Sequence, residues 1–470
     1  MNYKCAVILA AGEGTRMKSS KPKAMAEVLF KPMIDWVISA AKKGGAEEVC
    51  VVTGYKSEIL KDHLDGSIET VLQQERLGTG HAVMQARDFI KAHTPGNVLV
   101  LNGDAPLMDA DTISGALDFH CETGNTATVI SAKVANPFGY GRIERNEKGL
   151  LKAIVEEKEA NDTQKQINEV NSGAFWFDSS ALLKALDILA SSHDKSKEYY
   201  LTDAIEIILS NGGKAAAYVS KTPDVVLGAN DRAQLYELNE IARKSVLTKI
   251  MKSGVSIPCI DGVMIDPEAE IGVDTQILPG TIIKGKTVVG SGCLIGPNSI
   301  VDNSKIEDDV ELNNTQVYSS LVRSGAQIGP FVRIRPGCDV GADVRVGNFV
   351  ELKNANIGDE TKISHLTYIG DADFGKNINV GCGCATVNFN GREKNRTVVG
   401  DNAFIGCSTY LVAPVKVGDN AYTAAGSVIT EDVPKDSLAL ARSRQTIKKG
   451  WVTSKKPYKW QKEGEYKHEK

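Results

Sequence analysis

The chain has 470 residues, which suggests about three domains at roughly 150 residues each. Hydrophobic residues make up 42% and charged residues 24% of the chain, and the net charge is -4, so the composition is that of an ordinary soluble protein. This balance gives no basis for bulk attraction to nucleic acid or to a membrane surface.

The first apolar run, at residues 6–10, is short and is soon followed by Gly12, so it predicts neither a transmembrane helix nor a signal peptide. The nine cysteines occur singly, with no CxxC pair, which predicts neither a disulfide framework nor a structural zinc site. We therefore expect a cytoplasmic protein with no membrane partner.

Apolar runs of strand length alternate with segments of helical length in the first half. The expected strands are residues 7–9, 49–53, 98–101 and 127–134, and the expected helices include residues 33–43 and 80–93. This alternation predicts a Rossmann-like α/β domain, a mostly parallel sheet with helices on both faces. From Asp231, apolar residues recur every three or four positions, which predicts one amphipathic helix linking the halves; they are Leu235, Leu238, Ala242, Val246 and Ile250.

A different period begins at Ile271, where an aliphatic residue recurs at every sixth position. The repeating positions are 271, 277, 283, 289, 295, 301, 306, 312, 328, 334, 340, 346, 352, 357, 363, 369, 399, 405, 411 and 417. This period is typical of a parallel β-helix, in which each short strand turns one aliphatic side chain inward. Glycine directly follows many of these aliphatics, and we expect it to give the corners their backbone freedom; these are Gly272, Gly290, Gly296, Gly329, Gly341, Gly347, Gly358, Gly400, Gly406 and Gly418.

Two segments do not fit the repeat. The polar stretch ATVNFNGREKNRT, at residues 385–397, interrupts it, and we expect this stretch to project as a loop; such loops often carry function. The basic tail that begins at Arg442 is either a flexible solvated end or an arm that packs on a ligand or a neighbouring subunit.

The segment LAAGEGTRMKSSKPK, at residues 9–23, follows the first expected strand and is rich in glycine and basic residues. Glycines let backbone N–H groups approach a phosphate, and cations such as Arg16 and Lys23 neutralise its charge. The expected ligand is a nucleoside triphosphate. A GxG pair alone could be a structural turn, and the segment matches neither a P-loop nor the dinucleotide fingerprint.

The combination of GEGTRM with KPK resembles the sugar-phosphate nucleotidyltransferases, whose signature is LAAGxGTRM followed by a PK pair. The segment LQQERLGTGHA, at residues 72–82, matches the uracil-binding pattern of uridylyltransferases, because the Gln73 amide can pair with a pyrimidine edge. The strand in VLVLNGDAPL delivers Asp104 to the carboxyl edge of the sheet, where Mg2+ best explains a carboxylate among phosphates and a turn aspartate is the alternative.

The resemblance implies transfer of a uridylyl group from UTP to a sugar-1-phosphate with release of pyrophosphate, assisted by Arg16 and Lys23 as catalytic cations. Asp104 and Asn230 would bind Mg2+, and Asn102 stands where several relatives carry tyrosine. The implied nucleotide and sugar contacts are Leu9, Ala10, Ala11, Gly12, Lys23, Gln73, Gly78, Thr79, Asn102, Gly103, Asp104, Gly141, Glu156, Asn171 and Asn230.

Polar side chains on the repeat suggest a second site. Arg335 and Lys353 can clamp a phosphate, and His365 can act as a general base near pH 7, which suits acyl transfer to an amino sugar phosphate. A lone histidine could instead be structural. The strings GNFVELK, SHLTY and VNFNG resemble the acetyltransferase half of the bacterial bifunctional N-acetylglucosamine-1-phosphate uridyltransferases and glucosamine-1-phosphate acetyltransferases, so the resemblance covers residues 3–450.

In that family the β-helix is left-handed, the protein is a homotrimer, and acetyl-coenzyme A binds between neighbouring coils. The resemblance implies His365 as the catalytic base, with sugar-phosphate contacts from Arg335, Lys353, Tyr368 and Asn379 and acetyl-coenzyme A contacts from Cys382, Asn388, Phe389, Cys407, Ala425 and Arg442. Glu351 lies in the same pattern, and the loop at 386–397, with Lys394, would complete a neighbour's site. Phe389 stands at a position that is often tyrosine in the family and Cys407 at one that is serine in some members, so weaker polar anchoring is expected there.

These observations divide the chain into an α/β nucleotidyltransferase domain at residues 1–229, a linker helix at 230–252, an all-β left-handed β-helix at 253–437 and a basic tail at 438–470. The expected function is acetylation of glucosamine-1-phosphate followed by Mg2+-dependent formation of UDP-N-acetylglucosamine from UTP, on small-molecule substrates only. The alternatives are a single-activity nucleotidyltransferase with a structural or regulatory β-helix, and a non-enzymatic sugar-nucleotide sensor.

Overall fold

The structure is a computed structural model that describes residues 3–192 and 198–455. The chain forms two compact units, the first comprising Met1–Ser253, Met264–Ala269 and Ile283–Gly285, and the second comprising Gly254–Val263, Glu270–Ile282 and Lys286–Lys470. The helix expected as a linker therefore belongs to the first unit, together with two short segments of the repeat.

The first unit is built on a nine-stranded sheet whose main path runs β11-β7-β10-β6-β1-β4-β5. In that order the strands are Ala215–Val219, Ala127–Lys133, Glu169–Asp178, Gly96–Asn102, Tyr3–Ala10, Glu48–Thr53 and Glu69–Leu72, and the hairpin β8 (Arg142–Arg145) and β9 (Leu151–Val155) joins at β10. Neighbours on this path pair in parallel except at β10, which is antiparallel to β6 and β7. The expected mostly parallel sheet is confirmed, with one reversed strand.

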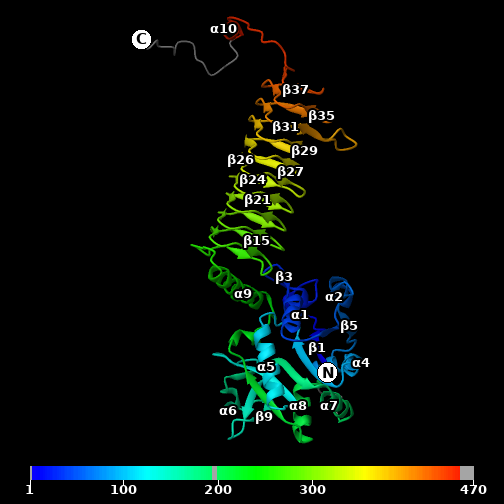
Figure 1. The fold of residues 1–470 in the computed structure, drawn as a ribbon. Helices are drawn as coiled ribbons and strands as arrows, with labels where there is room; N and C mark the ends of the chain where they lie inside the picture. The colour runs from blue at the N-terminus through cyan, green and yellow to red at the C-terminus, as the bar shows by residue number, and fades with distance from the viewer. Residues whose placement is uncertain (1–2, 193–197, 456–470) are drawn as a thin grey trace. The chain divides into compact units, whose positions relative to one another are not determined.

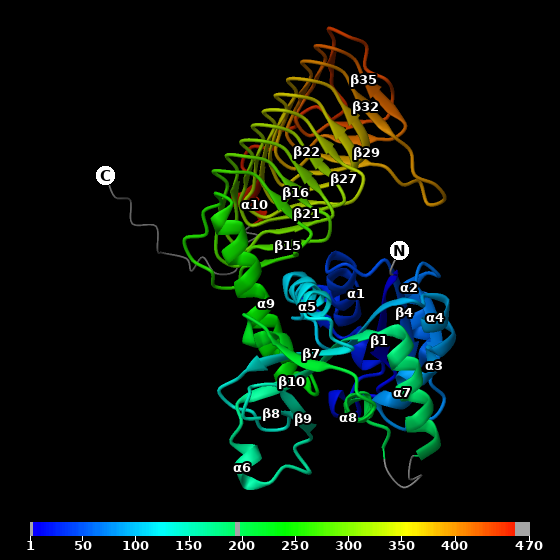
Figure 2. The ribbon, with the colours of Figure 1, turned by 60° about the horizontal axis from the view of Figure 1, so that its bottom comes forward.

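Helices cover both faces of this sheet (Figure 2). One face carries α3 (Thr79–Gln85), α4 (Arg87–Ala92), α7 (Ser179–Ser192) and α8 (Leu201–Ser210), and the other carries α1 (Met33–Lys43), α2 (Ser57–Leu64) and α5 (Ala110–Glu122). The side chains of β1 alternate between the two cores, with Val7 in one and Ala6 and Ile8 in the other, because successive residues of a strand point to opposite faces. The predicted two-faced architecture is confirmed.

The single helix expected at residues 80–93 is wrong, because the segment forms α3 and α4, two short helices that meet at Ala86. The backbone N–H of Ala86 bonds to the carbonyl of Val83, three residues back, which tightens the turn and redirects the chain. The apolar spacing alone could not reveal this break, since it continues through both helices.

The remaining elements of the first unit are short except for α9 (Arg232–Lys252). Leu235, Leu238 and Ala242 of α9 are buried as expected, whereas Val246 and Ile250 are half-buried and Leu247 is buried instead. The short elements are β2 (Glu27–Val28), β3 (Lys31–Pro32), α6 (Asp162–Lys165) and the 3-10 helices Thr15–Met17, Lys23–Met25 and Pro223–Val226.

The second unit is a stack of short strands in which each coil pairs in parallel with the next, as in the left-handed β-helix that the resemblance implied (Figure 1). One sheet contains β12 (Met264–Ile265), β13 (Glu270–Ile271), β15 (Ile282–Lys284), β16 (Val288–Val289), β18 (Ile300–Asp302), β19 (Lys305–Ile306), β21 (Thr315–Tyr318), β22 (Leu321–Val322), β24 (Val332–Ile334), β25 (Asp339–Val340), β27 (Val350–Ile357), β29 (Tyr368–Phe374), β31 (Ala385–Val387), β32 (Thr397–Val399), β34 (Tyr410–Val412), β35 (Val415–Val417) and β37 (Val428–Ile429). The other contains β14 (Gln276–Ile277), β17 (Leu294–Ile295), β20 (Glu311–Leu312), β23 (Gln327–Ile328), β26 (Arg345–Asn348), β28 (Lys362–His365), β30 (Asn379–Val380), β33 (Phe404–Ile405), β36 (Tyr422–Thr423) and β38 (Leu438–Ala439).

The repeating aliphatic side chains form the interior of this stack. All of the predicted positions are buried except Ile271, in the first coils, which is half-buried. The six-residue period is interrupted after Leu312 and after Ile369. The next inward positions there lie five residues apart, at Val317, Val322 and Phe374, and these residues are also buried. The expected β-helix is confirmed, and it is more continuous than the period alone indicated.

The role expected for the corner glycines is wrong for most of them. Among the ten, only Gly296 and Gly329 have a positive φ. A Cβ on Gly341 would instead lie 2.7 Å from the backbone nitrogen of Asp359, and one on Gly418 would lie 2.5 Å from that of Lys435. Glycine is therefore needed mainly because the backbone of the next coil passes too close for a side chain.

The polar interruption projects from the stack as expected, but it is shorter than predicted (Figure 1). Thr386 lies in β31 and Thr397 in β32, and both are buried, so only residues 388–396 leave the coils. Stacking also continues into the predicted tail, where β38 pairs with β36. The tail forms a short helix, α10 (Trp451–Lys455), and the rest of it lies outside the described residues.

Candidate active sites

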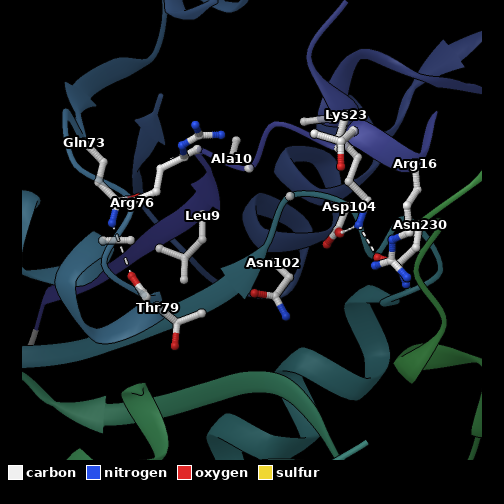
Figure 3. A pocket seen from close by; sticks show the side chains of 18 of the residues that line it. Leu9, Ala10, Arg16, Lys23, Gln73, Arg76, Thr79, Asn102, Asp104 and Asn230 are labelled. Atoms are coloured by element: carbon white, nitrogen blue, oxygen red, sulfur yellow. Dashed lines mark hydrogen bonds and ion pairs between the residues drawn. The ribbon is translucent and has the colours of Figure 1, made fainter. Parts of the chain in front are cut away.

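The nucleotide-binding residues expected from the sequence line one pocket of about 500 Å3 in the first unit (Figure 3). The pocket is lined by Leu9, Ala10, Ala11, Gly12, Arg16, Lys23, Gln73, Gly78, Thr79, Asn102, Gly103, Asp104 and Asn230. They meet because β1 and β6 are parallel neighbours, with Leu9 paired to Asn102, so the glycine-rich turn and Asp104 both follow strand ends at the same edge.

The expected sugar contacts line an adjoining pocket. Gly141, Glu156 and Asn171 lie there with Tyr140 and Thr202, and the two pockets share Leu9, Arg16, Thr79, Asn102, Asp104 and Asn230. Burial raises the pKa of Glu156 above its ordinary value, although a hydrogen bond from the Thr202 hydroxyl, 3.3 Å away, opposes the shift. The shared wall would hold two reactants side by side.

Lys23 connects the two residues expected to bind a metal ion. Its ammonium forms an ion pair with the carboxylate of Asp104 and donates a hydrogen bond to Oδ1 of Asn230 at 2.8 Å (Figure 3). Lys23 was expected to face phosphates, so this contact with both oxygen ligands is a finding that the sequence did not indicate. The lysine ammonium compensates the negative charge of the Asp104 carboxylate.

Sequence reasoning missed a second ionic contact at the mouth of this pocket. Nη1 of Arg76 lies 2.5 Å from a carboxylate oxygen of Glu13, so the loop after β5 is tied to the glycine-rich turn. Both residues stand inside the quoted motifs, but an exposed Glu and Arg about 60 positions apart give no sequence signal that they pair.

The predicted acetyl-transfer residues occupy two different places on the second unit. Glu351 and Tyr368 line one pocket, and His365 lines another. In the first place, Nη1 of Arg335 donates to Glu351 at 3.0 Å, and the Asn388 amide lies 3.5 Å from the Tyr368 hydroxyl. Across the coils that the structure describes, no hydrogen bond or ion pair joins the His365 ring to these groups. One chain alone therefore does not gather the complete predicted set.

Asp371, which the sequence analysis missed, holds the first of these places together. Its carboxylate accepts hydrogen bonds from Asn354 at 2.7 Å and Asn388 at 2.5 Å, and Lys353 lies 3.4 Å away. Burial alone would raise the pKa of Asp371, but these donors and the Lys353 ammonium together lower it below its ordinary value. Lys394 lies beside Lys353 of the same chain, which lowers the pKa of Lys394.

His365 belongs to a column of residues on successive coils. The paired strands β28, β30, β33 and β36 place Lys362, Asn379, Phe404 and Tyr422 at equivalent positions of four successive coils. The residues three positions after these are also equivalent, so they form the column; they are His365, Cys382, Cys407 and Ala425. Glycine at position 406 allows the next coil to pass close by, because a Cβ there would lie 2.6 Å from the backbone nitrogen of Ala425. Three of the six residues expected to contact acetyl-coenzyme A thus follow the histidine along one edge.

The other predicted contacts lie near this edge or on the projecting loop. Asn379 is exposed in β30, Phe389 is exposed and pairs with Lys394 by a backbone bridge, and Arg442 is exposed beyond β38. Within residues 3–192 and 198–455, no helix has the length and apolar character needed to span a bilayer. In the same part of the chain, no three His, Cys, Asp or Glu side chains are grouped as metal ligands.

The fold and the two sites define a nucleotidyl transferase joined to a hexapeptide-repeat transferase. The family model "Nucleotidyl transferase" matches residues 5–225, and "Bacterial transferase hexapeptide (six repeats)" matches residues 396–431. The bifunctional protein GlmU of Acetivibrio thermocellus is 48% identical over 97% of this chain and 99% of its own, and that of Clostridioides difficile is 44% identical over 97% and 98%. The chain belongs to the GlmU family of bifunctional transferases.

Part of the chain is also similar to a solved structure. It is described as a putative glucose-1-phosphate thymidylyltransferase from Bacillus anthracis in complex with a sucrose, and it aligns with 51% of this chain and 95% of its own at 19% identity and a TM-score of 0.43.

Proposed function

We propose that the chain makes UDP-N-acetylglucosamine in two steps, acetylation of glucosamine-1-phosphate by acetyl-coenzyme A and then uridylyl transfer from UTP. The observation that carries the proposal is that one pocket gathers the glycine-rich turn, Gln73 and the Lys23–Asp104–Asn230 cluster beside an adjoining pocket lined by the expected sugar contacts. Membership of the bifunctional GlmU family supports the pairing of this centre with an acetyltransferase.

In uridylyl transfer, an oxygen of the sugar phosphate attacks the α-phosphorus of UTP, and the bond to pyrophosphate breaks with its electron pair. Both reactants are anions, so catalysis needs positioning and charge neutralisation more than a protein nucleophile. Arg16 lines both pockets and can neutralise charge at their shared wall, while the glycine-rich turn would present backbone N–H groups to the phosphates.

The oxygen donors of Asp104 and Asn230 fit Mg2+, which proteins commonly hold by one or two carboxylates together with substrate phosphates. Both oxygens already face a single cation, the Lys23 ammonium, which supports a cation-binding role for the pair. When bound, the ion would neutralise phosphate charge. Lys23 would have to leave these oxygens and turn to the phosphates, so we assign it to binding them.

In acetyl transfer, the amine nitrogen of glucosamine-1-phosphate attacks the thioester carbonyl, the C–S bond breaks, and coenzyme A leaves as the thiol. We assign His365 the role of taking the amine proton. The cations of Arg335 and Lys353 would bind the sugar phosphate, and the column from Cys382 to Ala425 would guide the extended acyl donor.

We propose a homotrimer in which neighbouring β-helices share each acetyl-transfer site. Phe331, Phe349 and Leu366 stand on successive coils with exposed fractions of 55%, 58% and 59%, and they line the same pocket as Tyr368. Such a column of exposed apolar side chains favours burial by another subunit. A neighbour could then bring His365 and the Asp371 cluster together. The free cysteines of the chain support the expected cytoplasmic location.

Two assays on the purified full chain test the proposal. We expect pyrophosphate release from UTP only with N-acetylglucosamine-1-phosphate, and free thiol from acetyl-coenzyme A only with glucosamine-1-phosphate. A chelator such as EDTA should abolish pyrophosphate release and leave thiol release intact, since only phosphoryl transfer needs Mg2+. If thiol release were absent while pyrophosphate release remained, the β-helix would be structural or regulatory.

A further inference from the structure

The side-chain amide of Gln73 is held in one orientation inside the nucleotide pocket. Gln73 follows β5, is only 5% exposed, and its backbone N–H donates to the carbonyl of Thr53 at 2.8 Å. Its Nε2 donates to the carbonyl oxygen of Gly78 at 3.2 Å and lies 3.0 Å from Nδ1 of His81.

These two contacts use both N–H groups of the amide. A backbone carbonyl can only accept a hydrogen bond, so the end of the amide that faces Gly78 must be the nitrogen. If the amide turned over, its oxygen would face the Gly78 carbonyl, and two acceptors would oppose each other. The Gln73 oxygen is therefore the polar atom left for a ligand.

We propose that His81 is a positioning residue for nucleobase choice: by accepting from Gln73 at Nδ1, it keeps the Gln73 carbonyl directed at the ligand and so selects uracil over cytosine. Uracil carries an N–H at ring position 3 and can donate to that carbonyl, whereas the same position of cytosine is an acceptor. The inference rests on the proposed uridylyl transfer and deepens it, because a site built to pair with one polar edge rejects the mismatched one.

The surroundings of His81 support this tautomer. Only one nitrogen of a neutral imidazole accepts, yet amide nitrogens approach both, Gln73 at 3.0 Å and Gln85 at 3.2 Å. Gln73 is buried and fixed by Gly78, while Gln85 is half-buried and already donates from Nε2 to the backbone carbonyl of His81 at 3.1 Å, so it does not need the ring nitrogen as an acceptor. The ring also packs against Tyr199, with centroids 5.9 Å apart, so its position does not depend on the ligand.

Two matched variants test the hydrogen-bond acceptor of His81 separately from the packing of its ring. His81→Phe keeps a ring beside Tyr199 but has no acceptor, and His81→Asn loses the ring but keeps a side-chain oxygen near the position of Nδ1. The measurement is kcat/KM for UTP and for CTP with N-acetylglucosamine-1-phosphate, by pyrophosphate release. We expect His81→Phe to lower the UTP-to-CTP ratio by about tenfold, the factor of one ordinary hydrogen bond, and His81→Asn to retain most of the ratio.

The outcomes separate a failure of this inference from a failure of the proposed function. If wild-type protein released no pyrophosphate from UTP, the proposed function itself would fail. If the wild type were active but His81→Phe kept its UTP-to-CTP ratio, or if both variants lowered the ratio equally, the positioning role would be overturned. Thermal unfolding of the same preparations reports on folding, and His81→Leu replaces the phenylalanine variant if that one does not fold.

Discussion

The carboxylate of Asp371 is buried and fixes the positions of the polar side chains around it. Its oxygens take hydrogen bonds from Asn354 and Asn388, and its charge faces Lys353, so two predicted ligand-binding groups depend on one unpredicted residue. A buried charge is tolerated only when it is paired and hydrogen-bonded, which this one is. Its lowered pKa means that it stays ionised throughout the neutral range.

We expect Asp371→Asn to reduce acetyl transfer at least tenfold without changing uridylyl transfer. The new amide can accept at only one end, so one asparagine contact and the charge that attracts Lys353 are both lost. Thiol release from acetyl-coenzyme A measures the effect. Asp373→Asn is the matched control, because this carboxylate lies in the same strand but pairs with Arg396. Equal loss in the control would show that any charge removed from β29 disturbs the site.

The residues of the nucleotide pocket were predictable because they fall in short contiguous motifs at the ends of adjacent strands. Asp371, Arg76 and His81 act instead through partners brought near by the fold, and their type and spacing carry no signal. Asp371, for instance, meets Asn354 and Asn388 from coils 17 residues away on either side. Such a contact exists only once the coils have stacked.

At the scale of elements, periodicity predicted which side chains point inward but not how closely the backbones approach. Apolar residues every six positions indicate the coils of the β-helix because one inward side chain per strand fills its interior. The same pattern missed the five-residue steps from Leu312 to Val317 and from Val317 to Val322, where the inward position shifts by one residue. It also continued across the break at Ala86, where a backbone hydrogen bond divides the helix.

The corner glycines yield a prediction at this scale. Gly341→Ala should destabilise the β-helix by about 1–3 kcal/mol, the usual cost of forcing an extra carbon into a packed site. The added Cβ would meet the nitrogen of Asp359 at 2.7 Å and the carbonyl of Ile357 at 2.8 Å, both backbone atoms that cannot move aside. Thermal unfolding measures the change. Glu307→Ala, at a corner that already carries a side chain, should leave Tm nearly unchanged, and an equal drop there would contradict the clash.

At the scale of the whole molecule, the chain places its two proposed centres in different compact units. The Lys23–Asp104–Asn230 cluster belongs entirely to the first unit, and His365 and the Asp371 cluster belong entirely to the second. Hydrogen bonds and ion pairs at each centre therefore connect residues of the same unit. From this separation we expect each centre to work independently of the other and the intermediate N-acetylglucosamine-1-phosphate to pass between them through solvent.

We expect Asp104→Ala to lower uridylyl transfer at least about a hundredfold and leave acetyl transfer unchanged, because it removes charge stabilisation from the first centre. We expect His365→Ala to lower acetyl transfer by a similar factor and leave uridylyl transfer unchanged, because it removes the general base from the second centre. Each variant alone should then fail to convert glucosamine-1-phosphate, acetyl-coenzyme A and UTP into the nucleotide sugar. A mixture of the two purified variants should restore this conversion, because the freely diffusing intermediate made by one is used by the other. Chromatographic detection of UDP-N-acetylglucosamine measures the result, and a mixture that stayed inactive while each retained its single reaction would mean that the intermediate does not leave the protein.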